Sequence, residues 1–96
     1  MNLREDIRRQ IISLAKEYNL ERVILFGSRA RGDNRERSDI DLAIVGELAA
    51  CIEFSLAVDE DIETLLMFDC VIVDEKLSAE LRAEIEKDGV ILYEQV

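Results

Sequence analysis

Two acidic residues stand at the start of an apolar segment, at a spacing that could hold a metal ion. Asp39 and Asp41 flank Ile40 and precede the apolar run 42–45, which has the composition of a buried strand. Residues i and i+2 of a strand point to the same face, so we expect the two carboxylates to lie side by side. Adjacent anions repel each other unless a cation lies between them, and Mg²⁺ prefers carboxylate oxygens together with substrate phosphates. In a chain with 22 acidic residues, the same spacing would also fit a solvated acidic turn.

A glycine and a serine, Gly27 and Ser28, end a second apolar run at residues 23–26. Glycine permits a sharp turn and a close approach by phosphate oxygens. Backbone N–H groups at such a turn attract anions, and the Ser28 hydroxyl can donate to a phosphate. The alternative is an ordinary strand-ending turn with a serine cap. Together with the two acids, the turn predicts chemistry on a nucleoside triphosphate.

The segment between this turn and Asp39 contains four arginines, Arg29, Arg31, Arg35 and Arg37. Arg29 and Arg31 are close enough in sequence to the turn to contact phosphates, although solvation at the surface is the commoner fate of a single arginine. The chain as a whole carries a net charge of −10. This negative net charge disfavours nucleic acid as a partner. A local cluster of arginines around a bound triphosphate is compatible with a negative charge of the whole chain.

The combined pattern resembles the signature of the DNA polymerase β-like nucleotidyltransferase superfamily. It consists of Gly-Ser, three residues, Gly, five residues and Ser-Asp-x-Asp-Leu, within residues 23–45, and the resemblance continues to Tyr93. The small size resembles the minimal nucleotidyltransferases, the MNT proteins that are paired with HEPN proteins in prokaryotes. The resemblance implies an α/β (α+β) fold of two layers, with a mixed central sheet of about four strands and helices packed on it. It also implies metal-site acids on adjacent central strands, with the third acid on an antiparallel neighbour.

The family has a third metal-site carboxylate on a later strand, and two residues could supply it. Asp69 opens the apolar segment 68–73, in agreement with the family's Asp-x-Val pattern, whereas Asp74 closes it and reads as the start of a loop. We therefore predict Asp69 and keep Asp74 as the alternative. The resemblance implies that Asp39, Asp41 and Asp69 hold two Mg²⁺ ions and take part in catalysis. It further implies that the nucleotide is bound by Gly27, Ser28, Arg29 and Arg31.

The implied activity is transfer of AMP from ATP to an acceptor hydroxyl, with release of pyrophosphate. The implied partner is a small helical HEPN protein, because members of this group are antitoxins that neutralise a HEPN ribonuclease, in some cases by adenylylating a tyrosine on it. Two other functions stay open. One is a non-catalytic antitoxin that occludes a basic partner, which the acidic balance would suit. The other is a free-standing transferase for a small molecule, against which the lack of a substrate-binding domain counts.

Length and composition predict one domain over residues 1–96, since 49% of the residues are hydrophobic and can form a core. The resemblance implies that this is a nucleotidyltransferase domain. No apolar run has membrane-spanning length, and the N-terminus lacks the apolar stretch of a signal peptide. Cys51 and Cys70 lie in apolar segments without metal-binding spacing, which predicts buried thiols in a cytoplasmic protein. A homo-oligomer stays open.

The pattern of apolar residues predicts helices and strands that would position these groups. Helices are expected at 3–18, 28–31, 47–66 and 78–88, and strands at 23–26, 39–45, 68–73 and 90–93. The third helix is ambiguous in register. We expect its acidic triplet 59–61 to break it or divide it, and its inner face to consist of Ile52, Leu56, Ile62, Leu65 and Leu66. Gly89 is expected at the position just past the last helix, in the left-handed conformation.

Overall fold

Four helices and four strands alternate along the chain in the computed structural model, which describes residues 1–96. In chain order they are α1 (Glu5–Glu17), β1 (Arg22–Phe26), α2 (Gly27–Arg31), β2 (Ile40–Val45), α3 (Leu48–Asp61), β3 (Phe68–Ile72), α4 (Ala79–Asp88) and β4 (Val90–Glu94). Every predicted element is therefore present, with ends that differ by a few residues. None of the four helices has the length and hydropathy needed to span a bilayer.

The strands form one mixed sheet in the order β3-β2-β1-β4, which confirms the predicted sheet. Strand β1 is antiparallel to both β2 and β4, while β2 and β3 are parallel. The expectation that the third acid lies on an antiparallel central strand is wrong, because β3 is parallel to β2 and forms an edge. The reason is the connection: α3 carries the chain back along the sheet, as a parallel crossover requires.

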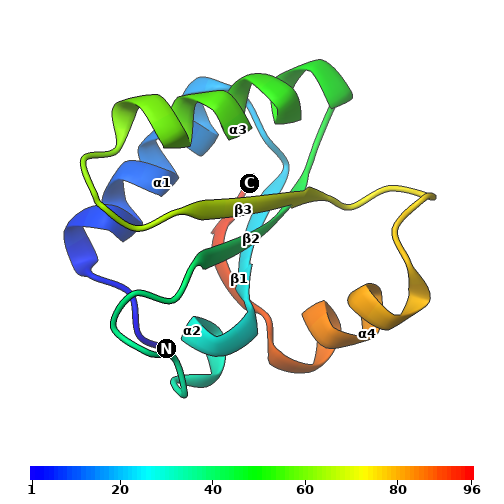
Figure 1. The fold of residues 1–96 in the computed structure, drawn as a ribbon. Coiled ribbons are helices and arrows are strands. Elements are labelled where there is room, and N and C mark those ends of the chain that lie inside the picture. Colours follow the sequence, from blue (N-terminus) through cyan, green and yellow to red (C-terminus); the bar gives the residue numbers. More distant parts are fainter.

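Helices lie on both faces of the sheet (Figure 1). The main core of 17 buried residues lies between the sheet and the pair α1 and α3, and a smaller core of Phe26, Ala43 and Ile85 lies under α4. Strand β2 alternates between the two cores, since Ile40, Leu42 and Ile44 are fully buried on the side of α1 and α3. The odd-numbered residues of β2, including Asp41, therefore face α4.

Helix α1 follows its predicted amphipathic pattern. Ile7, Ile11, Leu14 and Ala15 are buried at helical spacing, and the polar side chains face solvent. The chain leaves the helix at Asn19, whose φ of 57° is in the left-handed region that asparagine tolerates. This tight exit allows β1 to begin only three residues later and to run directly to the glycine-serine turn.

Helix α3 differs from its prediction in both length and rotation. It runs without a break to Asp61, and its buried face consists of Cys51, Phe54, Ala57 and Val58. The predicted inner residues Ile52 and Leu56 are exposed. The helix is apolar on both faces, so hydrophobic periodicity could not fix its rotation. The acidic triplet occupies its last turn, where negative charge opposes the helix dipole, and the helix ends there.

Helix α4 begins and ends at the predicted residues, but its end has a different cause. The Ser78 hydroxyl accepts a hydrogen bond from the Leu81 N–H at 3.2 Å, as an N-cap does. Gly89 has φ −64°, so the predicted left-handed conformation is wrong. Glycine is needed there for space: a Cβ would lie 2.7 Å from Ile24 Cγ2 and would collide with the Ile85 carbonyl oxygen. The close approach lets α4 pack directly on β1.

Candidate active site

The first part of the site is a pair of acids on neighbouring strands. Asp41 of β2 and Asp69 of β3 are direct partners in the parallel register. Because paired residues of adjacent strands project to the same face, both carboxylates lie on the α4 side of the sheet. Asp39 is exposed one residue before β2. The structure therefore brings Asp41 and Asp69 together, with Asp39 close by at the same end of β2.

Asp74, the alternative third acid, lies beyond the opposite end of β3. Its carboxylate accepts a hydrogen bond from the Lys76 N–H at 2.9 Å and so closes a turn. Its backbone carbonyl accepts a second bond, from the Arg82 guanidinium at 2.7 Å. The position and the contacts of Asp74 are those of a loop residue.

Burial and repulsion within the acid group perturb Asp41. Burial first, and then the charges of Asp69, Asp39 and Glu84, together raise the pKa of Asp41 to about 6, while the Arg31 charge opposes them. Glu84 of α4 is thus a fourth acid in this region that sequence analysis did not identify. A group of carboxylates with this little compensating charge favours a bound cation.

The glycine-serine turn lies directly against this group. Phe26, the last residue of β1, pairs with Asp41 across the antiparallel ladder, so Gly27 follows beside it. Gly27 has φ +74°, and a Cβ at this position would collide with the Asp41 carboxylate. Glycine is therefore required here twice, for its backbone conformation and for the space that Asp41 occupies.

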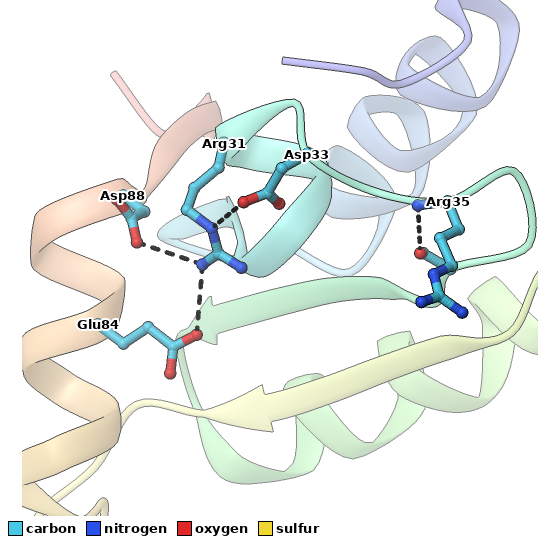
Figure 2. A network of polar contacts seen from close by, with 6 residues as sticks. Arg31, Asp33, Arg35, Glu84 and Asp88 are labelled. Atoms are coloured by element: carbon cyan, nitrogen blue, oxygen red, sulfur yellow. Dashed lines mark hydrogen bonds and ion pairs between the residues drawn. The ribbon is translucent and has the colours of Figure 1, made fainter.

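Arg31 connects the turn to α4 (Figure 2). Its Nε donates to Asp33 at 3.1 Å, and its terminal nitrogen donates to Asp88 at 3.3 Å and lies 3.8 Å from Glu84. Its bonds to Asp33 and Asp88 raise the pKa of the Arg31 guanidinium. Exposed ion pairs add little stability, so we interpret the network as one that positions Arg31 near the acids. The two α4 acids lie at i and i+4, but nothing in the sequence shows that this face meets α2.

Arg29 is buried, with only 6% of its surface exposed, and binds backbone carbonyls. Its guanidinium donates to the Ser38 oxygen at 3.0 Å, the Glu36 oxygen at 3.0 Å and the Asn2 oxygen at 3.2 Å. These bonds fix the loop that leads to Asp39. The sequence pattern predicts a nucleotide contact for Arg29 and gives no sign of this role, because a buried arginine that binds loop carbonyls has no distinct pattern.

The chemistry of the donors fits a hard divalent cation, although the side chains are not yet gathered around one. No three Asp, Glu or Cys side chains lie in an arrangement that could hold a metal ion. Asp39 and Asp69 are exposed, and they offer carboxylate oxygens of the type Mg²⁺ prefers. Burial and the neighbouring carboxylates raise the pKa of Asp41, so a bound cation would stabilise its charged form.

The family follows from comparison with known proteins. The family described as "Polymerase beta, Nucleotidyltransferase" matches residues 9–96, which include the turn, the acids and all four strands. The chain belongs to this nucleotidyltransferase family. The resemblance found in the sequence is thereby confirmed, and members of this family typically depend on a metal ion.

Four proteins show where this nucleotidyltransferase stands within the family. It is 31% identical over 104 residues to "Putative protein adenylyltransferase MJ0604" of Methanocaldococcus jannaschii, a match that covers 97% of the chain and 100% of that protein. It is similar to a chain in a crystal structure of a toxin-antitoxin with AMP-PNP, with a TM-score of 0.67, 26% identity and coverage of 92% and 73%. It shares its fold with a structure of a tri-AMPylated Shewanella oneidensis HEPN toxin in complex with MNT antitoxin, with a TM-score of 0.64, 23% identity and coverage of 97% and 74%. A structure described as that of a putative minimal nucleotidyltransferase is also similar, with a TM-score of 0.65, 30% identity and coverage of 86% of each chain, and this nucleotidyltransferase is of the minimal type.

Substituting asparagine for Asp41 is expected to stabilise the metal-free protein. The folded-state pKa of Asp41 lies above its ordinary value of 3.8, so ionisation of Asp41 disfavours the folded state. This penalty is absent below about pH 4, grows as the pH rises toward 6 and is complete above it. After allowance for partial exposure, the gain from Asp41→Asn at pH 7.5 is about 1–2 kcal/mol. Urea unfolding in EDTA, measured from pH 4 to pH 8, checks this, and a gain that does not shrink at pH 4 would contradict it.

Substituting lysine for Arg29 is expected to destabilise the protein in the absence of any ligand. A lysine ammonium cannot reproduce the planar fork that contacts three carbonyls, so at least one buried acceptor loses its partner. The expected loss of unfolding free energy is about 2–4 kcal/mol. Arg35→Lys, at an exposed side chain of the same loop, is the matched control and should change stability by less than about 0.5 kcal/mol. Equal stability of the two variants in urea unfolding would contradict the structural role of Arg29.

Proposed function

We propose that this chain acts as one nucleotidyltransferase domain, residues 1–96, which transfers AMP from ATP to a tyrosine hydroxyl of a HEPN partner and so neutralises that partner. The observation that carries the proposal is the pairing of Asp41 with Asp69 beside Gly27. A relative named as a protein adenylyltransferase and a similar toxin-antitoxin chain with an ATP analogue support the donor and the type of acceptor. Unpaired Cys51 and Cys70 are consistent with the cytoplasm as the place of this reaction.

Different residues of the chain would bind the metal ions and the phosphates in such a transfer. Asp39, Asp41 and Asp69 would hold two Mg²⁺ ions, which when bound supply positive charge to the triphosphate and its leaving pyrophosphate. The backbone N–H groups of Gly27 and Ser28 donate to the β- and γ-phosphates, and the Arg31 guanidinium adds positive charge beside them. A contact of Arg29 with the nucleotide would require its guanidinium to release at least one of the loop carbonyls that it now binds.

In the transfer itself, the tyrosine oxygen forms a bond to the α-phosphorus while the bond from that phosphorus to the oxygen bridging to the β-phosphate breaks. Pyrophosphate leaves with the electron pair, and the tyrosine proton passes to a carboxylate oxygen of Asp69. Positioning and charge neutralisation supply most of the rate in this kind of reaction, so no strong base is needed.

An antitoxin that only occludes its partner is the second candidate function. The observation in its favour is the excess of acidic over basic residues, 22 against 12. The resulting net charge of −10 would suit a cap on a basic ribonuclease.

The test is to co-express this chain with the protein encoded by the neighbouring gene and to incubate the pair with Mg²⁺ and labelled ATP. We expect label from the α-phosphate to appear on the partner and label from the γ-phosphate to remain in solution. The double variant Asp39→Asn/Asp41→Asn should transfer nothing. A stable complex that silences the partner without any transfer would instead support occlusion.

A further inference from the structure

The outer face of α3 carries a stripe of exposed apolar side chains that the proposed chemistry does not use. Leu48, Ile52 and Leu56 follow one another at the i, i+4 spacing that aligns residues along one helix face. They are 59%, 49% and 59% exposed, respectively. The opposite face of α3, with Phe54 fully buried, packs against the sheet. Helix α3 is thus apolar on two sides, of which only one is covered.

The exposed apolar residues are concentrated in this part of the chain. Eight large apolar side chains are exposed, and five of them lie within residues 48–67. Besides the stripe, these are Leu65 and Met67, which border a groove of about 500 Å³ together with Asp59, one turn after the stripe. Single exposed apolar residues are common, whereas a group of this kind marks a contact surface. We call the five residues Leu48, Ile52, Leu56, Leu65 and Met67 the α3 surface.

The charges around the α3 surface restrict what can cover it. Residues 38–75 contain eleven acidic side chains and no lysine, arginine or histidine. On α3 itself, Glu53 and Glu60 line a shallow hollow beside Leu56, and Asp59 continues the stripe toward the groove. A second copy of the chain on this surface would place acid against acid, which strongly opposes association. Nucleic acid and anionic lipid are disfavoured for the same reason.

We propose that the α3 surface docks a partner protein whose contacting face presents apolar side chains flanked by lysines or arginines. The inference rests on the proposed function in one respect, because it takes this partner to be the protein that receives AMP. Met67 lies beside the first residue of β2, where its carbonyl accepts a hydrogen bond from the Ile40 N–H at 2.8 Å. The stripe on α3 is on the face away from Asp41, because α3 and α4 lie on opposite faces of the sheet (Figure 1) and Asp41 lies on the α4 side. Docking on α3 therefore leaves the carboxylates uncovered, and binding and transfer depend on different residues.

The test compares three variants co-expressed with the protein encoded by the neighbouring gene. Ile52→Glu/Leu56→Glu is expected to weaken the complex at least about tenfold, because it places charge in the apolar contact. Glu53→Lys/Glu60→Lys is expected to weaken it and to reduce its dependence on salt. The matched control is Ile91→Glu on β4, since Ile91 is exposed to a similar degree, 54%, outside the α3 surface. This control is expected to bind like the wild type in titration calorimetry and size-exclusion chromatography with light scattering.

Several results would overturn the proposal. They are wild-type affinity in Ile52→Glu/Leu56→Glu, absence of a complex with the wild type, and a wild-type homodimer that this double variant converts to a monomer. All the replaced side chains are exposed, and circular dichroism verifies folding; if Ile52→Glu/Leu56→Glu were misfolded, Glu53→Lys/Glu60→Lys would decide. AMP transfer is scored separately with α-labelled ATP. A complex that depends on α3 but transfers no AMP would contradict the proposed function and leave the docking surface in place.

Discussion

Replacing Gly27 with alanine is expected to abolish AMP transfer, whereas the same change at Gly32 is expected to leave transfer close to that of the wild type. The two glycines have similar backbone angles, with φ of +74° and +85°. Alanine at either position therefore loses about 1 kcal/mol of stability to backbone strain. Only at Gly27 would the new methyl group collide with a side chain, that of Asp41, since nothing lies within 4 Å of a Cβ at Gly32.

Comparing Gly27→Ala with Gly32→Ala separates the effect of backbone strain from the effect of displacing the Asp41 carboxylate. A displacement of about 1 Å at a reacting centre costs on the order of 100-fold in rate, so Gly27→Ala should lose at least that much. Transfer of α-labelled AMP measures the rates, and urea unfolding measures the stability of each variant, so that a loss of folded protein is not mistaken for a loss of rate. Equal rates for Gly27→Ala and Gly32→Ala would show that Asp41 can move aside without consequence, which contradicts the proposed site.

The second large effect is expected at the acids themselves. Asp39→Asn, Asp41→Asn and Asp69→Asn should each lower AMP transfer on the order of 10³-fold, because each removes a charge that would hold the metal ions. Asp74→Asn should change transfer by less than about twofold, since its carboxylate closes a turn at the far end of β3. Assays with Mg²⁺ and α-labelled ATP on the co-expressed pair measure all four variants.

Stability measurements keep this comparison interpretable. Because Asp41→Asn is expected to be more stable than the wild type in EDTA, its loss of transfer cannot come from unfolding. Added Mg²⁺ should then raise the unfolding temperature of the wild type and have little effect on Asp41→Asn. If Asp74→Asn abolished transfer while Asp69→Asn did not, the third carboxylate would be Asp74.

Much of the site's frame could be predicted because its local signals are strong. The apolar runs that end at Phe26 and Val45 are bounded by glycines, and strands of this kind are short, buried and unambiguous. Residues i and i+2 on β2 had to share a face, and the burial of Ile40 and Leu42 leaves Asp41 on the other side. The family pattern predicts Asp69 as the third acid, and the register of β3 places Asp69 beside Asp41.

What could not be predicted depends on contacts between distant parts of the chain. The direction of β3 depends on α3, which carries the chain back along the sheet before β3 begins. No local sequence pattern encodes this return. The predicted rotation of α3 about its axis is wrong because Ile52 and Leu56, which are exposed, are as apolar as the residues that are buried. The bonds of Arg29 could not be predicted either, because its three carbonyl partners come from loop and N-terminal residues whose positions only the fold determines.

The hydrogen bonds between Arg29 and Asn2 bear on how the protein should be handled. The Asn2 N–H donates to the Arg29 oxygen at 2.8 Å and the Asn2 oxygen accepts from the Arg29 guanidinium, so the N-terminal segment is tied to the base of the Asp39 loop. An affinity tag fused before Met1 would emerge beside that loop and crowd the acceptor's approach. The other end is safer: Glu94 pairs with Arg22, which places Val96 at the end of β1 away from Gly27. Purification tags and surface-coupling chemistry for all these assays belong at the carboxyl terminus.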